Sequence, residues 1–465
     1  MFSSINMKNI TTPLGGICVV DKVEKDFGLI SSVFGDVLGP NDIGRVKILL
    51  NNRLTYSTSV NQIMSITPNE TCELLDVGKV SDRSLYRTIV KVGRHANIII
   101  EKYQDNIKKN EAVDKNQNID WSSLFFQGKT AEMAEFGYSR DRRPDKKQVT
   151  FGISTGINGV PSALTIQNGN VLDKIHFTET YKIVRRIMES GSLLIFDCGA
   201  NTKANKEKIV ADGFHYLTLK PKKVSTYKRY IIEFKKSEKI KFKVDDKEYI
   251  AVKIKEGNEY QYIYFCKPLL EDQIHKKQRK FEIKKKTGNE LAKKAEKHKI
   301  VDRFPSEKGW IELYPELQLT LGIIENPYIT GVEGFFILES TVDASPVEIL
   351  SIYKQRDAAE KLIRNLKEGI EIRPIRHFTK NAIIGAIVIA FLAESLISLT
   401  QLSCKNPLVK NVKLLKKYLT NLTLTFVYPE NGFRFQVVSN VSPPILELFG
   451  DFWRKYETKN LHLRW

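Results

Sequence analysis

The chain shows successive patterns of hydrophobic and polar positions. The first 112 residues have several short helical periods, the clearest at 41–52, 60–65 and 81–93. Residues 149–220 instead alternate strand-like apolar runs with helical segments. The strand runs lie at 149–154, 163–166, 193–197 and 216–219, and the helical segments at 177–190 and 201–211. Strands interleaved with helices of this length indicate an α/β sheet covered by helices.

A strongly basic block follows this α/β pattern. Residues 221–303 carry 25 Lys and Arg against 13 Asp and Glu, so their net charge is +12. The first half alternates apolar and charged positions, with turn signals at 245–246 and 257–258, and predicts a small antiparallel sheet. The second half predicts a basic helix over about 269–299, broken near residue 287. The block is either solvated surface or an arm that follows phosphates.

The α/β pattern resumes after the basic block. A strand is predicted at 334–339, and Pro346 begins a long helix to residue 367, because Pro favours the first helical turn. An apolar stretch at 383–399 predicts a buried helix that closes the sheet. The basic block therefore reads as an insertion into one α/β domain.

The overall charge narrows the class of partner. The 465 residues carry a formal net charge of +19, with a pI near 9.4. A positive net charge of this size favours a polyanion as the binding partner. Nucleic acid is a better candidate than an acidic membrane, because the sequence shows no strongly apolar amphipathic anchor. The longest apolar run, residues 382–392, meets Glu394 before it is long enough to span a bilayer. We expect DNA as the partner, with no membrane and no small-molecule substrate.

Cysteine usage indicates the compartment. The five cysteines are widely spaced without a Cys-x2-Cys pair, which argues against a zinc module or a disulfide framework. The first residues lack the apolar core of an export signal. We therefore expect a cytoplasmic protein.

One face of the predicted 346–367 helix carries polar and charged groups. At 100° per residue, five side chains fall within an arc of about 80°. They are Tyr353, Arg356, Glu360, Arg364 and Lys367. The arrangement is either a solvated ladder of ion pairs or a face that brings a carboxylate and cations to a ligand.

Two more carboxylates lie at the ends of predicted strands. Asp197 closes the apolar run 193–196, where ligands bind at the carboxyl edge of an α/β sheet. Asp120 opens a strand at 120–126, unless it is only a turn residue. With Glu360, these acids supply the hard oxygen ligands that suit Mg²⁺ and phosphoryl transfer assisted by two ions.

The helix also contains the string Tyr353-x2-Arg356-x3-Glu360-x6-Lys367. This string resembles the signature of a group of DDE transposases from prokaryotic insertion sequences. Further matching blocks follow in the order that the family shows, at 136–148, 159–173, 197–205 and 373–376. The resemblance covers about residues 75–450.

The resemblance implies an α/β fold in which a ribonuclease-H-like catalytic domain is interrupted by a β-rich basic insertion and preceded by a helical N-terminal DNA-binding region. The implied bounds are 1–112 for the N-terminal region, 113–220 and 333–465 for the two parts of the catalytic domain, and 221–332 for the insertion. It also implies a homodimer in a synaptic complex, acting on element ends and target DNA near the nucleoid of a prokaryotic cell.

The family's metal triad corresponds to Asp120, Asp197 and Glu360, which would hold two Mg²⁺ or Mn²⁺ ions. The family usually has Asp-x-Thr at the first position, where this chain has Asp120-Trp-Ser. Asp141 and Asp145 therefore compete with Asp120 for the role of first acid.

The resemblance also implies DNA contacts. Tyr353, Arg356 and Lys367 would contact phosphates at the transposon end, and Arg364 is a further candidate because it shares their arc. Trp310, in the insertion, is either core packing or a platform for a displaced base.

A basic helix is predicted at 81–93 behind an N-cap at Ser81. It presents Arg83 and Arg87 at helical spacing, so it is either a DNA recognition helix or a plain surface helix.

The sequence therefore predicts a DNA transposase that cleaves at terminal inverted repeats and transfers the 3′-hydroxyl ends to target DNA. Two alternatives stay open: a transposase-derived DNA-binding protein without cleavage, and a metal-dependent nuclease.

Overall fold

The computed structural model describes residues 8–78, 80–286, 326, 328–404, 407–429 and 433–458. By its internal contacts the chain divides into two compact units. The first comprises Met1–Glu189 and Asp357–Trp465, and the second comprises Ser190–Arg356. The predicted domain boundaries at residues 112, 220 and 332 stay predictions.

The first unit begins with a helical cluster. Its N-terminal helices are α1 (Gly15–Phe27), α2 (Leu29–Phe34), α3 (Pro40–Leu54), α4 (Val60–Ile66), α5 (Asn69–Leu74), α6 (Asp82–Arg94) and α7 (Ala96–Lys109). The three helices expected near 41–52, 60–65 and 81–93 are thus present as α3, α4 and α6. The Ser81 hydroxyl caps α6 by accepting a hydrogen bond from the Ser84 N–H, at 3.3 Å, as predicted.

The same unit contains two small antiparallel sheets. One has the order β4-β3-β2, from β2 (Gln117–Phe125), β3 (Gln148–Thr155) and β4 (Pro161–Asn168), with α8 (Asp173–Val184) packed on it. The other has the order β1-β11-β12, from β1 (Lys8–Pro13), β11 (Thr423–Tyr428) and β12 (Phe435–Ser439). The remaining helical segments are α16 (Asp357–Arg364), the π-turn η3 (Asn365–Gly369), α17 (Lys380–Leu402), α18 (Val412–Asn421), α19 (Pro443–Phe449) and η4 (Phe452–Tyr456).

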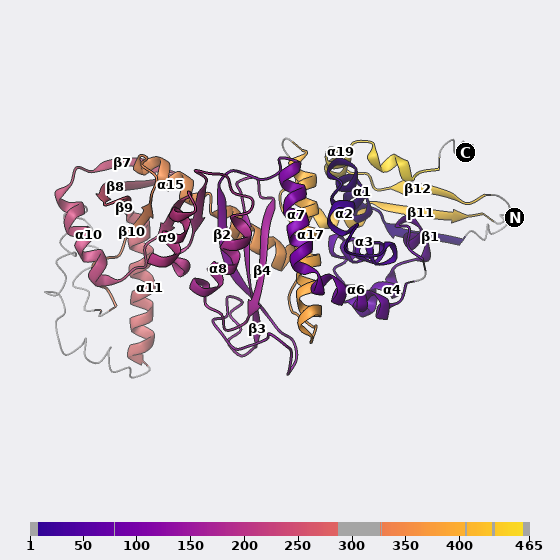
Figure 1. Cartoon of the computed structure of the whole chain (residues 1–465), viewed down its shortest axis with the longest axis horizontal. Helices are drawn as coiled ribbons and strands as arrows, with labels where there is room; N and C mark the ends of the chain where they lie inside the picture. Colours follow the sequence, from indigo (N-terminus) through magenta and orange to yellow (C-terminus); the bar gives the residue numbers. More distant parts are fainter. Residues whose placement is uncertain are drawn as a thin grey trace. The chain divides into compact units, whose positions relative to one another are not determined.

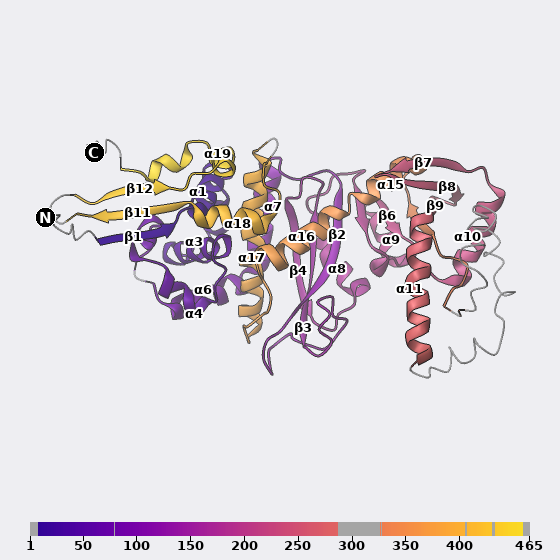
Figure 2. The same cartoon turned by 180° about the vertical axis from the view of Figure 1, so that it is seen from behind.

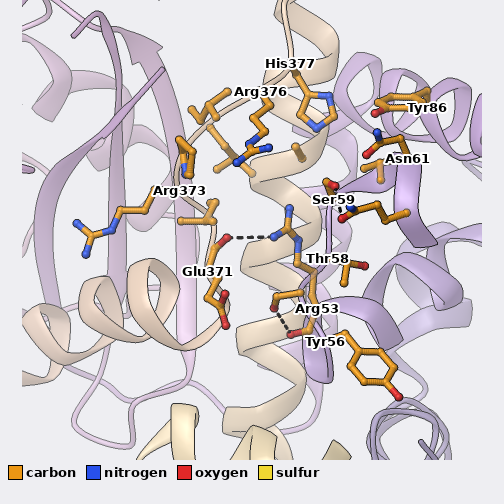
Figure 3. A pocket seen from close by; sticks show the side chains of 18 residues that line it. Arg53, Tyr56, Thr58, Ser59, Asn61, Tyr86, Glu371, Arg373, Arg376 and His377 are labelled. Atoms are coloured by element: carbon orange, nitrogen blue, oxygen red, sulfur yellow. Dashed lines mark hydrogen bonds between the residues drawn. The ribbon is translucent and has the colours of Figure 1, made fainter. Parts of the chain in front are cut away.

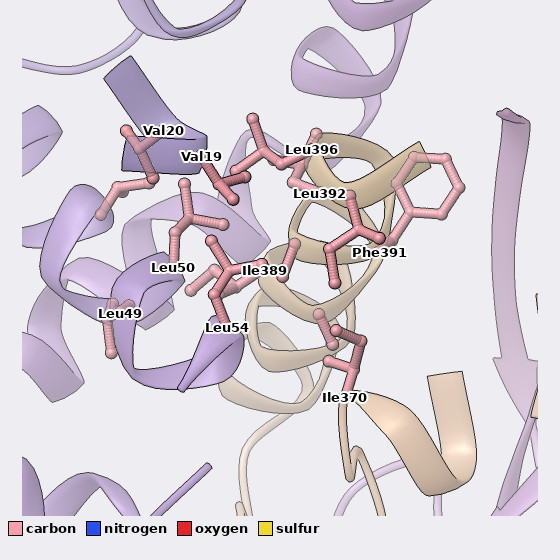
Figure 4. Packing of buried hydrophobic residues seen from close by; sticks show 14 of the residues in the cluster. Val19, Val20, Leu49, Leu50, Leu54, Ile370, Ile389, Phe391, Leu392 and Leu396 are labelled. Carbon is pink, nitrogen blue, oxygen red and sulfur yellow. The ribbon is translucent and has the colours of Figure 1, made fainter. Parts of the chain in front are cut away.

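Helix α17 is the centre of this unit. Figures 1 and 2 show it between the N-terminal helices and strands β2 to β4, and it packs on α6, α3, α1 and β4. Among the described residues it is the one helix long and apolar enough to cross a membrane, but 83% of its apolar window is buried inside the protein. Figure 4 shows Ile389, Leu392 and Leu396 of α17 against side chains of α1 and α3. The predicted buried helix is confirmed.

The contact between α6 and α17 depends on two glycines. A Cβ on Gly93 would lie 1.7 Å from the Asn381 carbonyl oxygen, and one on Gly385 would lie 1.9 Å from the Ile89 carbonyl oxygen. Both helices therefore approach to backbone contact, and only glycine fits at these two positions.

The second unit is a mixed sheet with helices on both faces. Its strands are β5 (Leu193–Phe196), β6 (His215–Leu219), β7 (Ile240–Val244), β8 (Lys247–Glu256), β9 (Glu259–Phe265) and β10 (Phe335–Ser340), in the order β5-β6-β10-β9-β8-β7. Strands β5 and β6 are parallel and the other neighbours are antiparallel. The helical segments are η1 (Cys198–Ala200), α9 (Lys203–Ala211), α10 (Val224–Lys236), α11 (Lys267–Lys286) and α15 (Pro346–Lys354).

The period-two pattern of the strands explains the two layers of helices. In β8, Ile250 and Val252 pack with residues of α10 and α11, whereas Tyr249 and Ala251 pack with residues of α15. Alternate side chains of one strand thus reach opposite faces of the sheet.

The predicted hairpins are present. Asp245 and Asp246 both have positive φ angles, 49° and 61°, in the two-residue turn between β7 and β8. This is the conformation that a tight hairpin favours. The strands do not form a separate small sheet, however, because β9 pairs with β10 and β10 pairs with β6. The basic helix is present as α11 up to Lys286, and its expected continuation lies outside the described residues.

Two local expectations were wrong. The long helix expected at 346–367 is divided into α15, α16 and a π-turn. The N–H groups of Gln355 and Arg356 bond to carbonyls three residues back, so the turn there is tighter than an α-helix. Strand β2 begins at Gln117, so Asp120 lies inside the strand and does not open it.

Candidate functional site

The second unit brings together two pairs of residues that are more than 150 positions apart in sequence. We call Asp197, Cys198, Tyr353 and Arg356 the Asp197 cluster. Asp197 follows the buried strand β5 directly, as predicted, and its carboxylate accepts a hydrogen bond from the Cys198 N–H at 2.7 Å. Tyr353 lies in the last turn of α15, and the Arg356 guanidinium is 5.9 Å from the centre of its ring.

Electrostatics connects these side chains. Burial raises the pKa of the Cys198 thiol to about 11, the Asp197 carboxylate adds to the rise, and the Arg356 guanidinium opposes it. Burial likewise raises the pKa of the Tyr353 phenol. The Arg356 guanidinium lowers this pKa, and the Asp197 carboxylate raises it further. Such charge effects fall off with distance, so the four groups are neighbours. At neutral pH Cys198 is a thiol, which makes it a poor nucleophile.

Asp197 suits a cation ligand. It is half-buried, and among the described residues no Lys, Arg or His forms an ion pair with its carboxylate. A half-buried carboxylate of this kind is stabilised by a bound cation.

A basic hollow of about 210 Å³ lies close to the Asp197 segment in the same unit and was missed by sequence reasoning. Its lining includes Asn201, Lys203, Lys206, Lys220, Lys223 and Glu339. Burial alone would raise the pKa of Glu339, but the Asn201 amide, at 2.6 Å, and the Lys220 ammonium hold it below its usual value. The residues come from α9 and the turn before it, the loop between β6 and α10, and β10, and no spacing in the sequence indicates that they meet.

The first unit holds the other two acids of the predicted triad. Helix α16 packs against β2 and β3, so the helix that carries Glu360 lies on the strand that carries Asp120. Ala359 and Leu362 face the core, whereas Glu360 is exposed. Asp120 is half-buried, and its carboxylate accepts a hydrogen bond from the Trp121 N–H at 2.9 Å.

The triad is thus divided between the two units, with Asp120 and Glu360 in one and Asp197 in the other. In the described part of the chain no group of three or more His, Cys, Asp or Glu side chains is arranged to hold a metal ion. The two-ion centre stays a prediction.

The competing acids have other partners. We call Asp141, Lys367 and Arg373 the Asp141 ion cluster. The Asp141 carboxylate is 2.8 Å from the Lys367 ammonium and 2.7 Å from the Arg373 guanidinium, and it also accepts the Phe125 N–H at 3.2 Å. Asp145 is exposed and paired with Arg143 at 2.8 Å. Neither carboxylate is available to a metal ion without breaking an ion pair.

The predicted phosphate contacts therefore differ in their surroundings. Lys367 is buried, with 8% of its side chain exposed; burial lowers the pKa of its ammonium, and the hydrogen bond with Asp141 opposes this. Arg364 is exposed at the end of α16. Arg83 and Arg87 are exposed on α6, whose opposite face packs on α17. Trp310 lies outside the described residues.

Comparisons with known proteins give no family for this chain. No family model matches it, and no curated protein matches it. Among solved structures, a piggyBac transposase synaptic complex with hairpin DNA aligns with 89% of this chain and 80% of its own, at 12% identity and a TM-score of 0.45. A likeness this distant supports no assignment of function.

Proposed function

We propose that this protein is a DNA transposase that cleaves DNA at the ends of its own element and joins the freed 3′-hydroxyl groups to target DNA. The observation that carries the proposal is the Asp197 cluster. There the carboxylate at the end of a buried strand meets Tyr353 and Arg356, two residues of the transposase-like signature that follow it by more than 150 positions. The cluster joins a cation ligand to groups that bind phosphate.

Each group has a chemical role in the proposal. Arg356 offers the planar guanidinium that binds phosphate through paired hydrogen bonds, and the Tyr353 phenol keeps its proton to donate beside it. Asp197, together with Asp120 and Glu360, would hold divalent ions, which supply positive charge to the attacking and leaving oxygens during phosphoryl transfer.

The reaction has two steps. In the first, water attacks the scissile phosphorus, the bond from phosphorus to the 3′-oxygen breaks, and a 3′-hydroxyl and a 5′-phosphate result. In the second, that 3′-hydroxyl attacks a target phosphodiester, a new bond from oxygen to phosphorus forms, and a target 3′-hydroxyl leaves. Both steps need the same arrangement of phosphate and carboxylates, since each is an in-line displacement at phosphorus.

Incubating the purified chain with Mg²⁺ and a plasmid that carries its terminal repeats tests the proposal. Joined products are expected for the wild type, and Asp197→Asn should abolish both cleavage and joining. Asp246→Asn is the matched control, because Asp246 is exposed in a turn of the same unit and asparagine tolerates its positive φ. Nicks without joining would indicate a nuclease, and a mobility shift without cleavage would indicate a DNA-binding protein; either result contradicts the proposal, as does cleavage by Asp197→Asn.

A further inference from the structure

The first unit contains a pocket that no part of the proposed reaction uses. It measures about 600 Å³ and is formed by the end of α3, the following loop, α4, α6, the 371–377 segment and α17. We call it the Arg53 pocket. Its walls carry Arg53, Arg376, Tyr86 and His377, with hydroxyl groups such as Ser59 between them (Figure 3).

Two guanidinium groups in this pocket lack a carboxylate. Arg53 donates a hydrogen bond to the Glu371 carbonyl oxygen at 3.1 Å, and Arg376 is exposed. Across the described residues neither arginine has an ion pair, and Figure 3 shows both guanidinium groups directed into the same space. Arg373 points away from it and pairs with Asp141.

The one acidic side chain of the lining does not balance this charge. The Glu371 carboxylate is 3.1 Å from the buried Lys416 ammonium, and its charge also acts on Arg53, so this one carboxylate faces two cations before Arg376 is counted. Two arginines that share a hollow without a counter-ion favour an anion, and phosphate matches the fork of their donors.

Aromatic rings stand beside the cations. Tyr86 and His377 lie edge to face with 5.9 Å between ring centres, and Tyr86 is 39% exposed. Burial lowers the pKa of His377 to about 4, and the charge of Arg53 contributes, so the imidazole is neutral at physiological pH. A phosphate site next to the exposed Tyr86 ring and the uncharged His377 ring matches a nucleotide, since aromatic side chains bind bases by stacking.

The pocket also adjoins a basic surface. Arg83 precedes Tyr86 by three residues on α6, and residues at this spacing are neighbours on a helix surface. Arg83 and Arg87 are both exposed. Positive charge therefore continues from the pocket along α6, as a strand that extends beyond one nucleotide would require.

We propose that the Arg53 pocket binds one unpaired nucleotide of a DNA strand, with its phosphate between Arg53 and Arg376 and its base against Tyr86 and His377. The inference rests on the proposed function, which supplies the DNA. A free nucleotide offers the same phosphate and base but does not use the basic surface of α6.

Binding of a labelled ten-nucleotide thymidine strand to the full chain, followed by fluorescence anisotropy, tests the phosphate contacts. The double variant Arg53→Gln with Arg376→Gln should bind at least tenfold more weakly than the wild type. Loss of the contacts to this one phosphate should also reduce the slope of log K against log salt by about 0.7. The control is Arg142→Gln with Arg454→Gln, which removes the same charge at exposed positions of the same unit. Equal losses in both double variants, or no loss in the first, would overturn the proposal.

A second variant tests the contact with the base and leaves Arg53 and Arg376 in place. Tyr86→Leu should weaken binding of the thymidine strand by roughly 5- to 150-fold, the range for loss of one stacked base. It should leave binding of an abasic strand unchanged. An equal effect on both strands would refute the stacking role.

Competition separates the two sources of the ligand. Thymidine monophosphate and inorganic phosphate should displace the strand only at concentrations far above those at which an unlabelled strand does so. Displacement by the monophosphate at similar concentrations would assign the pocket to a free nucleotide and overturn the proposal. Cleavage by the wild type distinguishes the pocket proposal from the transposase proposal. If the wild type cleaves DNA and the variants bind the strand as it does, only the pocket proposal is refuted. If the wild type does not cleave DNA but the variants lose binding as expected, only the transposase proposal is refuted.

Discussion

Glu394 is a carboxyl group near the middle of a largely buried helix. It lies in α17 and is 1% exposed. One of its oxygens accepts a hydrogen bond from the Asn365 amide at 2.9 Å, and the other has no hydrogen-bond partner among the described residues. Burial raises its pKa to about 8, and the hydrogen bond from Asn365 opposes the rise. Asn365 is the first residue of the π-helical turn that follows α16, the helix that carries Glu360. The hydrogen bond therefore connects α17 to the C-terminal end of α16.

The raised pKa makes stability depend on pH. In the unfolded chain the carboxyl group has its ordinary pKa of 4.5, so below pH 4.5 both states are protonated and the group adds no penalty. Between pH 4.5 and 8 the unfolded state loses its proton and the folded state keeps it, so stability falls as the pH rises. At pH 7 the difference of about 2.5 pH units corresponds to about 3 kcal/mol.

We therefore predict that Glu394→Gln gains stability relative to the wild type as the pH rises, by about 3 kcal/mol between pH 4.5 and 7. The amide stays neutral at every pH, and any constant loss from its unpaired N–H group cancels in this comparison. Urea unfolding followed by circular dichroism at pH 4.5, 5.5, 7 and 8 measures the difference.

Glu179→Gln is the control, because Glu179 is exposed in the same unit. Its effect should be nearly constant across the pH series. A constant difference between Glu394→Gln and the wild type would refute the reasoning, because it would mean that Glu394 is ionised in the folded protein at neutral pH.

Three further changes test contacts within the first unit, each measured by urea unfolding at pH 7. Asp141→Asn should destabilise the fold by about 3–5 kcal/mol because it removes the ion pair of the buried Lys367, whereas Asp145→Asn, at an exposed pair, should leave stability nearly unchanged. Gly385→Ala should cost roughly 1–3 kcal/mol or more at the backbone contact with α6, and Gly78→Ala, in open space, should be nearly neutral. Ser81→Ala should cost about 1 kcal/mol by removing the cap of α6. Equal losses of stability in Asp141→Asn and Asp145→Asn would contradict the buried ion pairs, and equal losses in Gly385→Ala and Gly78→Ala would contradict the backbone contact with α6. Unchanged stability of Ser81→Ala would contradict the N-cap.

Features set by neighbouring residues were predictable from the sequence. The β7–β8 turn follows from Asp245-Asp246 between alternating strands, and the burial of α17 follows from its largely apolar composition. The position of Asp197 at the end of β5 follows because four apolar residues precede it and a Cys-Gly turn follows it. In each case the determining contacts lie within a few residues.

Features set by distant contacts were not predictable. Arithmetic at 100° per residue placed Tyr353 and Lys367 on one face only because it assumed an unbroken helix, and the tight turn at Gln355 removes that assumption. The partner of Lys367 is Asp141, which precedes it by 226 positions. The Arg53 pocket likewise combines segments that no spacing relates.

The ion pairs of the competing acids bear on the identity of the first metal ligand. A divalent ion at Asp141 would have to displace Lys367 and Arg373 and would take the ion pair from the buried Lys367, which costs several kcal/mol. Asp145 is held by Arg143, two residues away, in an exposed loop. Asp120 lies on the strand against which the helix of Glu360 packs. Asp141 therefore fixes the Lys367 end of the signature to β2, because its carboxylate also accepts the Phe125 N–H, and the choice of the first acid stays a prediction.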